Sequence, residues 1–475
     1  MGVIFVEVSS AMNLKRTFSM QDQLDFASFS GDHNPIHIDE KKSIKTHAGQ
    51  PIVHGVHLVL WALDICKTNL KADSKLDIDF LSQVNLNTEV SAIFDEAKNV
   101  ITLIGSNEAK YCTIKIKKLS TVSNASISNN EVAFNKNGLK PDDLEIDEIR
   151  TGQMIDDLFG GSKKNLGRNL FPYLVKNIGL DFVYEIACIS SIVGMKIPGN
   201  HSLFLNLTLT FISSNKNKYI VVNNKHDVLK LLSISYFGIN LNAEIKALFR
   251  PKPTQVISIS CLIEKFDQHI SLENKKVLVI GGSRGIGAYV TKLCSIMGAS
   301  VTFTYNSQNK SAKLIEKEIL NNNGKVNCIK MNVLDDNDLK VLDKKFDYIY
   351  YFATPKILPN TSKGIDKKMA DHFYLFYVDT FKKIVKKSSS SNKKTKFLYP
   401  STTYIDDNKN DFREYISAKL EGERLCKSFN NKVNKNFFCP RIPPLDTDQN
   451  LSILPSKNSK ASEYAFHIIS LMVES

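Results

Sequence analysis

The stretch FASFSGDHNPIHID, residues 26–39, decides the fold of the N-terminal part of the chain. It places Asp32 and His37 five residues apart on a loop that Pro35 stiffens, so both side chains can face one cavity. A carboxylate and an imidazole that converge on one water can move protons at two neighbouring atoms of a substrate. We therefore expect an acid–base pair here, rather than a turn built only from Asp, Asn and Pro.

The residues that follow predict one helix and several strands. The phrase GQPIVHG (49–55) leads into HGVHLVLWALDICKTNL (54–70), whose apolar residues recur at helical spacing. TEVSAIF (88–94) and NVITLIG (99–105) alternate apolar and polar residues, as antiparallel strands do. One helix followed by a meander of strands indicates an α+β layer architecture.

Both phrases resemble the sequence signature of MaoC-like, R-specific enoyl-thioester hydratases, S-G-D-x-N-P-x-H. The matching residues are Ser30, Gly31, Asp32, Asn34, Pro35 and His37. The resemblance implies a hot-dog fold and acyl-thioester substrates, with Asp32 and His37 catalytic and Asn34 orienting the pair. The backbone N–H of Gly55 is our candidate donor to the thioester oxygen, which gains charge in the reaction.

A metal site is the alternative, with Asp32, His37 and Asp39 as ligands. The resemblance accounts for the same residues without a metal, so we expect none. We assign no chemistry to the remaining histidines of this region, which are His47, His54 and His57.

The next segments predict a linker and a second repeat. Residues 121–145 are rich in Ser, Asn and Lys, which favours a linker between a first hot-dog repeat at 1–120 and a second at 146–260. The second segment has a helical run, NLFPYLVKNIGLDFVYEIACISSIVG (169–194), followed by strand-like stretches, but no S-G-D-x-N-P-x-H. We expect it to be non-catalytic, with His201 as a loop residue.

From residue 265 to 475 strands alternate with helix-length segments, which predicts an α/β, Rossmann-like, doubly wound parallel sheet. KKVLVIGGSRGIGAYVTKL (275–293) places a glycine loop between a strand and a helix. The loop and YISAK (415–419) resemble short-chain dehydrogenases/reductases. That family implies catalysis by Tyr415, Lys419 and either Ser401 or Thr402, with the lysine lowering the pKa of the phenol. The implied cofactor-binding residues are Gly281, Ser283, Arg284, Gly285, Ile286, Gly287, Asn332, Ala353, Tyr415 and Lys419.

Two departures from this family concern catalysis. FATP (352–355) stands where the family has N-N-A-G, and HFYLFYVDTFKKIV (372–385) lacks the usual asparagine. The cofactor is expected to be NADP(H) rather than NAD(H), because TFTYNSQNK (302–310) has no acid for a ribose 2′-hydroxyl. Arg284 and Lys310 could meet a 2′-phosphate instead.

Composition restricts the partners. The eight cysteines include no CxxC pair, which argues against a disulfide framework and fits the cytoplasm. No apolar run has the roughly 20 residues of a membrane span. Residues 261–475 hold 34 Lys and Arg against 23 Asp and Glu, without the basic-aromatic interleaving of a nucleic-acid platform. A solvated basic surface is expected, which could also suit an acidic carrier.

The combined expectation is a bifunctional acyl-thioester enzyme. It would reduce a 3-oxoacyl group with NADPH and dehydrate the (R)-3-hydroxyacyl product, or run in reverse, on acyl carrier protein or coenzyme A, as a homo-oligomer. Two alternatives stay open: an NAD-linked hydratase with 3-hydroxyacyl dehydrogenase, and a dehydratase carrying a non-catalytic nucleotide-binding module.

Overall fold

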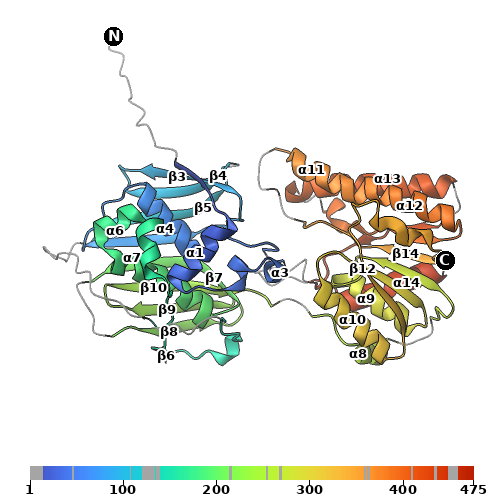
Figure 1. The fold of residues 1–475 in the computed structure, drawn as a ribbon, viewed down its shortest axis with the longest axis horizontal. Coiled ribbons are helices and arrows are strands. Elements are labelled where there is room, and N and C mark those ends of the chain that lie inside the picture. Colours follow the sequence, from blue (N-terminus) through green and yellow to red (C-terminus); the bar gives the residue numbers. More distant parts are fainter. Residues whose placement is uncertain are drawn as a thin grey trace, which may run out of the picture. The chain divides into compact units, whose positions relative to one another are not determined.

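The computed structural model describes residues 14–44, 46, 48–106, 108–119, 134, 140–212, 217–252, 255–266, 270–357, 360, 364–407, 410–432, 436–447 and 458–474. The chain divides near residue 252 into two compact units (Figure 1). Each unit has its own sheet and its own hydrophobic core.

The N-terminal unit is built on one ten-stranded sheet among the described residues. Across the sheet the strands are β1 (Leu14–Thr17), β3 (Glu89–Asp95), β4 (Val100–Gly105), β5 (Lys110–Lys118), β2 (Ser74–Phe80), β7 (Ser202–Phe211), β10 (Leu241–Phe249), β9 (Leu231–Phe237), β8 (Tyr219–His226) and β6 (Met154–Ile155). The segment before the predicted linker and the segment after it each supply one half. Antiparallel pairing of β2 with β7, from Lys75 opposite Thr210 to Asp79 opposite Asn206, joins the halves.

The helices of this unit lie in front of the sheet in Figure 1. They are α1 (Met20–Ser30), α2 (Pro35–Ile38), α3 (Glu40–Ser43), α4 (Gly55–Ile65), α5 (Gly167–Leu170), α6 (Pro172–Ile178), α7 (Leu180–Ser191) and the π-helical turn η3 (Ile192–Lys196), with 3-10 turns η1 (Ile146–Glu148) and η2 (Lys164–Leu166). The long helices α4 and α7, one from each half, pack together inside a shared core. A helix that is apolar on nearly every side is stable only when buried in this way.

Two helices differ from the sequence prediction. The helix α4 ends at Ile65, not at Leu70, because Lys67 adopts a left-handed φ of 51° and the Thr68 N–H returns to the Leu63 carbonyl at 3.2 Å. The run 169–194 is broken at Gly179, which has φ 91° between α6 and α7. Among the described residues no single helix has the length and hydropathy of a membrane span. The α6 and α7–η3 segments meet that test only together, across a bend of 118°.

The C-terminal unit contains the parallel sheet that the alternating pattern predicts. Its described strands, in spatial order, are β13 (Lys325–Lys330), β12 (Ser300–Tyr305), β11 (Lys276–Ile280), β14 (Tyr348–Tyr351), β15 (Lys396–Leu398) and β17 (Phe437–Phe438). The order reverses direction between β11 and β14, and ligands of such sheets bind at this switch point. A short parallel pair, β16 (Ser401–Thr402) with β18 (Arg441–Ile442), follows the sheet edge.

Helices cover both faces of this sheet. They are α8 (Ile259–Lys265), α9 (Gly285–Ile296), α10 (Asn309–Asn321), α11 (Lys367–Tyr374), the π-helical turn η5 (Leu375–Thr380), α12 (Phe381–Ser391), α13 (Arg413–Lys432) and α14 (Ala461–Glu474), with 3-10 turns η4 (Asp338–Asp343), η6 (Thr403–Ile405) and η7 (Asn410–Phe412). Val277 and Val279 of β11 belong to one core cluster, whereas Leu278 and Ile280 belong to another on the opposite face. This two-sided burial explains why β11 is apolar from Val277 to Ile280 instead of alternating.

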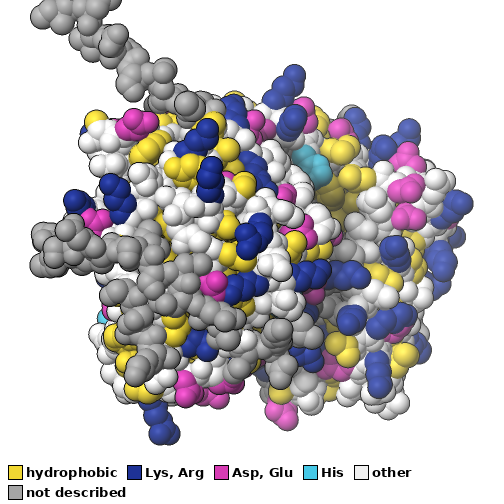
Figure 2. Space-filling view, turned by 60° about the vertical axis from the view of Figure 1, so that its left-hand side comes forward, with side chains coloured by type: hydrophobic (Ala, Val, Ile, Leu, Met, Phe, Trp, Pro, Cys, Tyr) yellow, Lys and Arg dark blue, Asp and Glu magenta, His cyan; other side chains and the backbone are white. Residues whose placement is uncertain are grey.

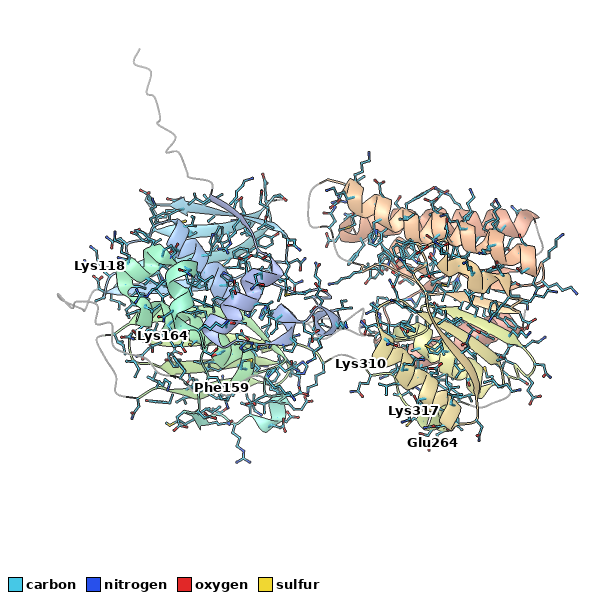
Figure 3. All side chains as sticks on the ribbon, in the orientation of Figure 1. Lys118, Phe159, Lys164, Glu264, Lys310 and Lys317 are labelled. Atoms are coloured by element: carbon cyan, nitrogen blue, oxygen red, sulfur yellow. The ribbon has the colours of Figure 1, made fainter. Side chains whose placement is uncertain are left out.

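The structure describes only a few residues of the predicted linker. Most of 121–145 lies outside the described residues, but Phe134 is buried and its ring lies 5.8 Å from that of Tyr184. On the face seen in Figure 2, Lys and Arg side chains are scattered among acidic and neutral ones. Exposed lysines at helix starts, such as Lys310 on α10 in Figure 3, belong to the same pattern.

Candidate active sites

Local capping signals build the loop that carries Asp32 and His37. Gly31 ends α1 in the left-handed region with φ 83°, and a Cβ there would lie 2.6 Å from the carbonyl carbon of Gly160. Asn34 caps α2, where its Oδ1 accepts the Ile36 N–H at 3.2 Å, and Pro35 occupies the first helical position. The sequence thus ends one helix at Gly31 and starts the next at Pro35. Asp32 lies between the two helices, and His37 lies in the second.

The loop opens onto a cavity of about 380 Å³. Its walls are mainly apolar and come from both halves of the unit. The lining residues are Asp32, Ile36, His37, Ile52, Val53, Gly55, Leu58, Phe80, Leu81, Ser82, Gln83, Val84, Ser190, Gly194, Ser202, Leu203, Phe204, Leu205 and Leu248. An apolar pocket with a few convergent polar groups is the usual form of a small-molecule site.

Asp32 is almost fully buried, with 2% of its surface exposed. The Ser190 hydroxyl of α7 donates to Oδ2 at 2.6 Å, and the Asn34 N–H donates to Oδ1 at 3.1 Å. A Cβ at Gly194 would lie 2.3 Å from Oδ1, so only glycine leaves room for the carboxylate. Burial raises the pKa of Asp32 to about 6 in spite of the two donors. The half without the signature motif therefore contributes directly to the site.

His37 has a defined tautomer. Its Nδ1 lies 2.8 Å from the carbonyl oxygen of Ile52, which can only accept, so Nδ1 carries the proton and Nε2 keeps its lone pair. Burial lowers the pKa of His37 to about 4, and the buried cation Arg250 acts in the same direction. The imidazole is therefore neutral at physiological pH and ready to accept a proton.

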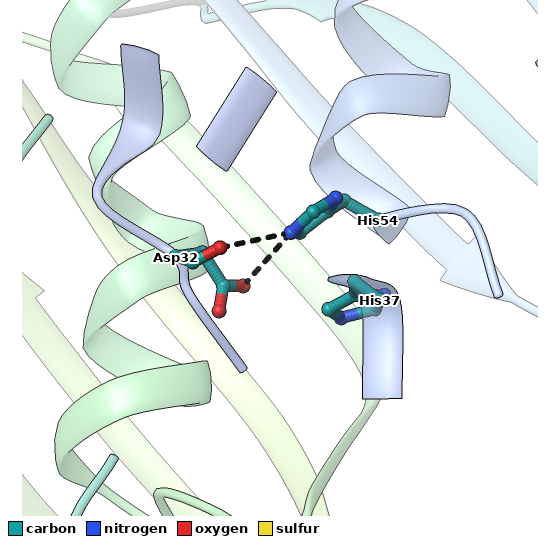
Figure 4. A group of neighbouring side chains, drawn as sticks. All are labelled: Asp32, His37 and His54. Atoms are coloured by element: carbon teal, nitrogen blue, oxygen red, sulfur yellow. Dashed lines mark hydrogen bonds and ion pairs between the residues drawn. The ribbon is translucent and has the colours of Figure 1, made fainter. Parts of the chain in front are cut away.

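His54, for which we predict no chemistry from the sequence, is the third member of this group (Figure 4). Its ring stacks on that of His37 with centroids 3.8 Å apart. Its Nε2 lies 3.1 Å from the backbone oxygen of Asp32 and 4.0 Å from Oδ2. Burial, and then His37, lower the pKa of His54 well below its ordinary value.

The three side chains are close enough to suggest metal binding, since one ligand atom of each lies within 4.8 Å of the others. Both ring nitrogens of His54 face oxygen atoms, Gln23 Oε1 at 2.9 Å and the Asp32 carbonyl at 3.1 Å, so both are engaged in hydrogen bonds and not in a metal site shared with His37. Asp39, the third ligand of the sequence alternative, instead caps α3 by accepting the Lys42 N–H at 3.0 Å. The geometry favours acid–base chemistry.

Asn34 and Gly55 have different surroundings. The prediction that the Asn34 amide orients Asp32 and His37 is wrong, because its Nδ2 donates to the Gly194 and Gly199 carbonyls at 2.9 and 3.2 Å. Asn34 thus ties the loop to the second half. Gly55 lines the cavity as the first residue of α4, where a backbone N–H has no helical acceptor. His47 lies outside the described residues, and His201 bonds Asp143 at 2.8 Å.

In the C-terminal unit, the glycine loop joins β11 to α9. A Cβ at Gly287 would lie 2.3 Å from the Gly281 carbonyl oxygen, so the loop can close only around glycine. Arg284 is the N-cap of α9, and Ser283 and Ile286 flank it, buried and half-buried. Ala353 follows β14 and its N–H lies against Gly281. These residues surround the switch point of the sheet.

Tyr415 and Lys419 lie one turn apart on α13. The Thr402 hydroxyl is hydrogen-bonded to Tyr415, whereas Ser401 donates to Glu423 at 2.6 Å, so Thr402 is the partner of the phenol. The predicted lowering of the phenol pKa is wrong: burial raises the pKa of Tyr415. Burial likewise lowers the pKa of Lys419 to about 7.

Lys419 is enclosed by aromatic rings. Its ammonium donates to the Pro400 carbonyl at 2.6 Å and lies 3.7 Å from the ring centre of Tyr377 and 4.9 Å from that of Tyr399. Tyr377 comes from η5, inside the stretch that lacks the usual asparagine. The only sequence signal for a role of Tyr377 is that its stretch lacks the asparagine that the resemblance leads us to expect.

Comparisons with known proteins assign both regions. A family model described as a MaoC like domain matches residues 8–101, and one described as short chain dehydrogenase matches residues 275–348. The chain is a fusion of a MaoC-like domain with a short-chain dehydrogenase domain. No curated protein matches it.

Solved structures of short-chain dehydrogenases/reductases are similar to part of the chain. A short-chain dehydrogenase/reductase from Serratia marcescens shares 20% identity over 42% of this chain and 91% of its own, with a TM-score of 0.39. The angucycline C-6 ketoreductase LanV with bound NADP shares 18% identity over 43% of this chain and 91% of its own, with a TM-score of 0.40. A short-chain type enzyme from Mycobacterium ulcerans shares 14% identity over 43% and 84%, with a TM-score of 0.39.

The short-chain dehydrogenase domain has residues that fit a phosphate-bearing cofactor. Gln308 Nε2, just after β12, and Lys356 Nζ, just after β14, are buried without a hydrogen-bond partner among the described residues. Burial, and then the nearby Arg284, lower the pKa of Lys356 to about 8. Buried donors that lack acceptors suit an anionic ligand. Asn332, expected to bind the cofactor, is exposed and its Oδ1 accepts the Leu334 N–H at 3.1 Å.

Proposed function

We propose that the MaoC-like domain interconverts (R)-3-hydroxyacyl and 2-enoyl thioesters, and that the short-chain dehydrogenase domain reduces 3-oxoacyl thioesters with NADPH. One observation carries the first half of the proposal. Two neighbouring groups have pKa values displaced in opposite directions, which supports Asp32 as the acid and His37 as the base.

In the dehydration direction, Nε2 of His37 takes the proton from Cα, and the electron pair of that C–H bond forms the double bond. The C3–O bond breaks as Asp32 donates its proton to the departing hydroxyl, which leaves as water. The Gly55 N–H would stabilise charge on the thioester oxygen, aided by the N-terminus of α4. The proton on His37 then returns to Asp32 through water, and hydration is the reverse path.

Apolar walls support an acyl substrate. Leu58, Leu203 and Leu248 are among the residues that face the cavity, while Phe80 and Phe204 contact each other with ring centres 5.3 Å apart. Such walls gain free energy by covering hydrocarbon and offer little to a polar chain. The carrier would be acyl carrier protein or coenzyme A, which are equivalent at the thioester.

In the short-chain dehydrogenase domain, the α9 N-terminus, Arg284, Gln308 and Lys356 would hold the phosphates and ribose of the cofactor. When bound, the nicotinamide supplies a hydride to the 3-oxo carbon. Tyr415, assisted by Thr402, would protonate the oxygen of the reduced carbonyl. The absence of an acid after β12 supports NADPH over NADH.

The test is incubation of the purified chain with 3-oxoacyl thioesters of several lengths and either NADPH or NADH, followed by mass spectrometry. An enoyl product formed with NADPH is expected. A strong preference for NAD in oxidation of the hydroxyacyl thioester would favour the opposite direction. Absence of turnover of both 3-oxoacyl and 3-hydroxyacyl thioesters would refute the proposal.

The enclosure of Lys419 favours a second candidate, in which the C-terminal domain binds a nucleotide without catalysis. Its ammonium bonds a backbone carbonyl beneath tyrosine rings. In that case the chain would bind NADPH and dehydrate a supplied 3-hydroxyacyl thioester, yet reduce no 3-oxoacyl thioester.

A further inference from the structure

The ring of His54 is held between oxygen atoms that can only accept hydrogen bonds. On one side Nδ1 lies 2.9 Å from Gln23 Oε1, and on the other Nε2 lies 3.1 Å from the Asp32 carbonyl. The Gln23 amide cannot be turned round, because its Oε1 also accepts the His54 backbone N–H at 3.0 Å. Turning it would bring an NH₂ group against that N–H.

A neutral imidazole has one N–H and can satisfy only one of these two acceptors. A second proton would satisfy both, and it would stand on Nε2, 4.0 Å from Oδ2 of Asp32. Gln23, His54 and Asp32 are all essentially buried, so a cation on His54 needs a compensating carboxylate. The pair therefore has two neutral forms: acid with imidazole, and carboxylate with imidazolium.

We propose that His54 is a positioning residue that stores the proton of Asp32 when the site is idle, with Gln23 fixing the outer N–H. The stored proton passes from Nε2 to the carboxylate, and Asp32 then delivers it to the departing hydroxyl. No proton is created or lost, because the pair holds one before the transfer and the return from His37 restores it. This inference rests on the proposed dehydratase function.

Storage of the proton on His54 extends the pH range in which Asp32 can act as an acid. Asp32 alone, with a pKa of about 6, would lose its proton below neutrality, whereas the pair loses it at higher pH. Burial is the largest effect that opposes a charge on His54, followed by His37 on α2, His57 on α4 and His33 in the loop between α1 and α2, so the imidazolium forms only beside the ionised Asp32 carboxylate. Arg250 acts on His37 from the second half. None of these four can supply a negative charge, so Asp32 is the counter-ion.

The kinetic test compares alkaline limbs of the pH profile of kcat/KM for hydration of a short enoyl thioester. His54→Gln should move the limb down by about one unit or more, to the titration of Asp32 alone near pH 6, because no imidazole then holds the shared proton. Gln23→Glu, of nearly the same shape, should move it up, because a carboxylate beside Nδ1 holds the imidazolium. His57→Gln is the matched control: it changes an equally buried histidine of α4 whose ring nitrogens have no hydrogen-bond partner among the described residues, and because His57 opposes a charge on His54 its loss should not move the limb down.

Limbs that stay in place in both variants, or that move in the same direction, would overturn the inference. NMR of ¹⁵N-histidine-labelled protein at pH 7 provides a test that needs no activity. His54 should show two protonated nitrogens in the parent and one in Asp32→Asn. A single N–H in the parent would refute proton storage even in an active enzyme, and two N–H groups in an inactive chain would refute only the dehydratase function.

Discussion

The two sites of the chain contain the same kind of chemistry in different surroundings. In the MaoC-like domain, Asp32 and His37 line a cavity of about 380 Å³, and the hydrogen bond from His37 Nδ1 to a carbonyl leaves its Nε2 available. In the short-chain dehydrogenase domain, the Lys419 ammonium bonds the Pro400 carbonyl beneath the rings of Tyr377 and Tyr399. Burial displaces the pKa values in both, but Asp32 and His37 line a cavity whereas Lys419 is engaged by a carbonyl and two rings.

The comparison shows that catalytic residue types can be present without having the protonation states that catalysis requires. Between about pH 4 and pH 6, burial leaves Asp32 protonated and His37 neutral, as an acid and a base require. For Tyr415 and Lys419 it raises the first pKa and lowers the second to about 7, which favours two neutral groups. A cofactor that brings charge to Lys419 would restore its ammonium form.

The largest effect is expected for Asp32→Asn. The amide keeps the shape but has no proton to donate to a leaving hydroxyl, so dehydration should fall about 100- to 10,000-fold. The reductase should be unaffected, and mass spectrometry should then show the 3-hydroxyacyl thioester accumulating from a 3-oxoacyl substrate. Unchanged enoyl formation in a variant with an unchanged melting temperature would remove Asp32 from the mechanism.

Tyr415→Phe tests the other side of the comparison. Without the phenol proton, reduction of a 3-oxoacyl thioester should fall by about 100-fold or more. Dehydration of a supplied 3-hydroxyacyl thioester should continue at the parental rate, which serves as the control for folding. If the parent binds NADPH but the substitution changes no measurable turnover, the domain is a nucleotide-binding module.

Much of the first site could be predicted because its signals are local. Gly31, Asn34 and Pro35 set a helix end and a helix start within a few residues, and these caps depend little on distant contacts. The parallel sheet was predictable for a similar reason, since β11 shows its two-sided burial in its own apolar run. The family resemblance supplied the roles of Asp32 and His37.

What the sequence could not give depends on contacts between distant segments. Ser190 reaches Asp32 across 158 residues, and Asn34 turns to carbonyls of the second half at a similar separation. His54 looked like an ordinary residue before a helix until the fold stacked it on His37. Tyr377 contacts Lys419 from a π-helical turn, and the spacing of apolar residues in the sequence does not predict such a turn.

Arg284→Ala should have an intermediate effect. Loss of a charge-assisted hydrogen bond of about 1.5–3 kcal/mol corresponds to roughly 10- to 100-fold weaker binding of NADPH. NADH lacks the 2′-phosphate, so its affinity should change little, and fluorescence titration of both nucleotides measures the difference. Equal losses for the two would mean that Arg284 contacts a shared part of the cofactor, not the 2′-phosphate.

The smallest effect should come from Ser190→Ala, and it tests whether the second half tunes the first site. Activity needs His37 neutral and Asp32 protonated in the dehydration direction. It should therefore fall as the pH drops through about 4 and as it rises past about 6, or past a higher value if His54 stores a proton.

The Ser190 hydroxyl stabilises the carboxylate, so removing it raises the pKa of Asp32 and moves the alkaline limb to higher pH. The acid limb should stay in place because His37 has no contact with Ser190 and keeps its bond to Ile52. A limb that moved down would show that Ser190 acts through packing and not through its hydrogen bond.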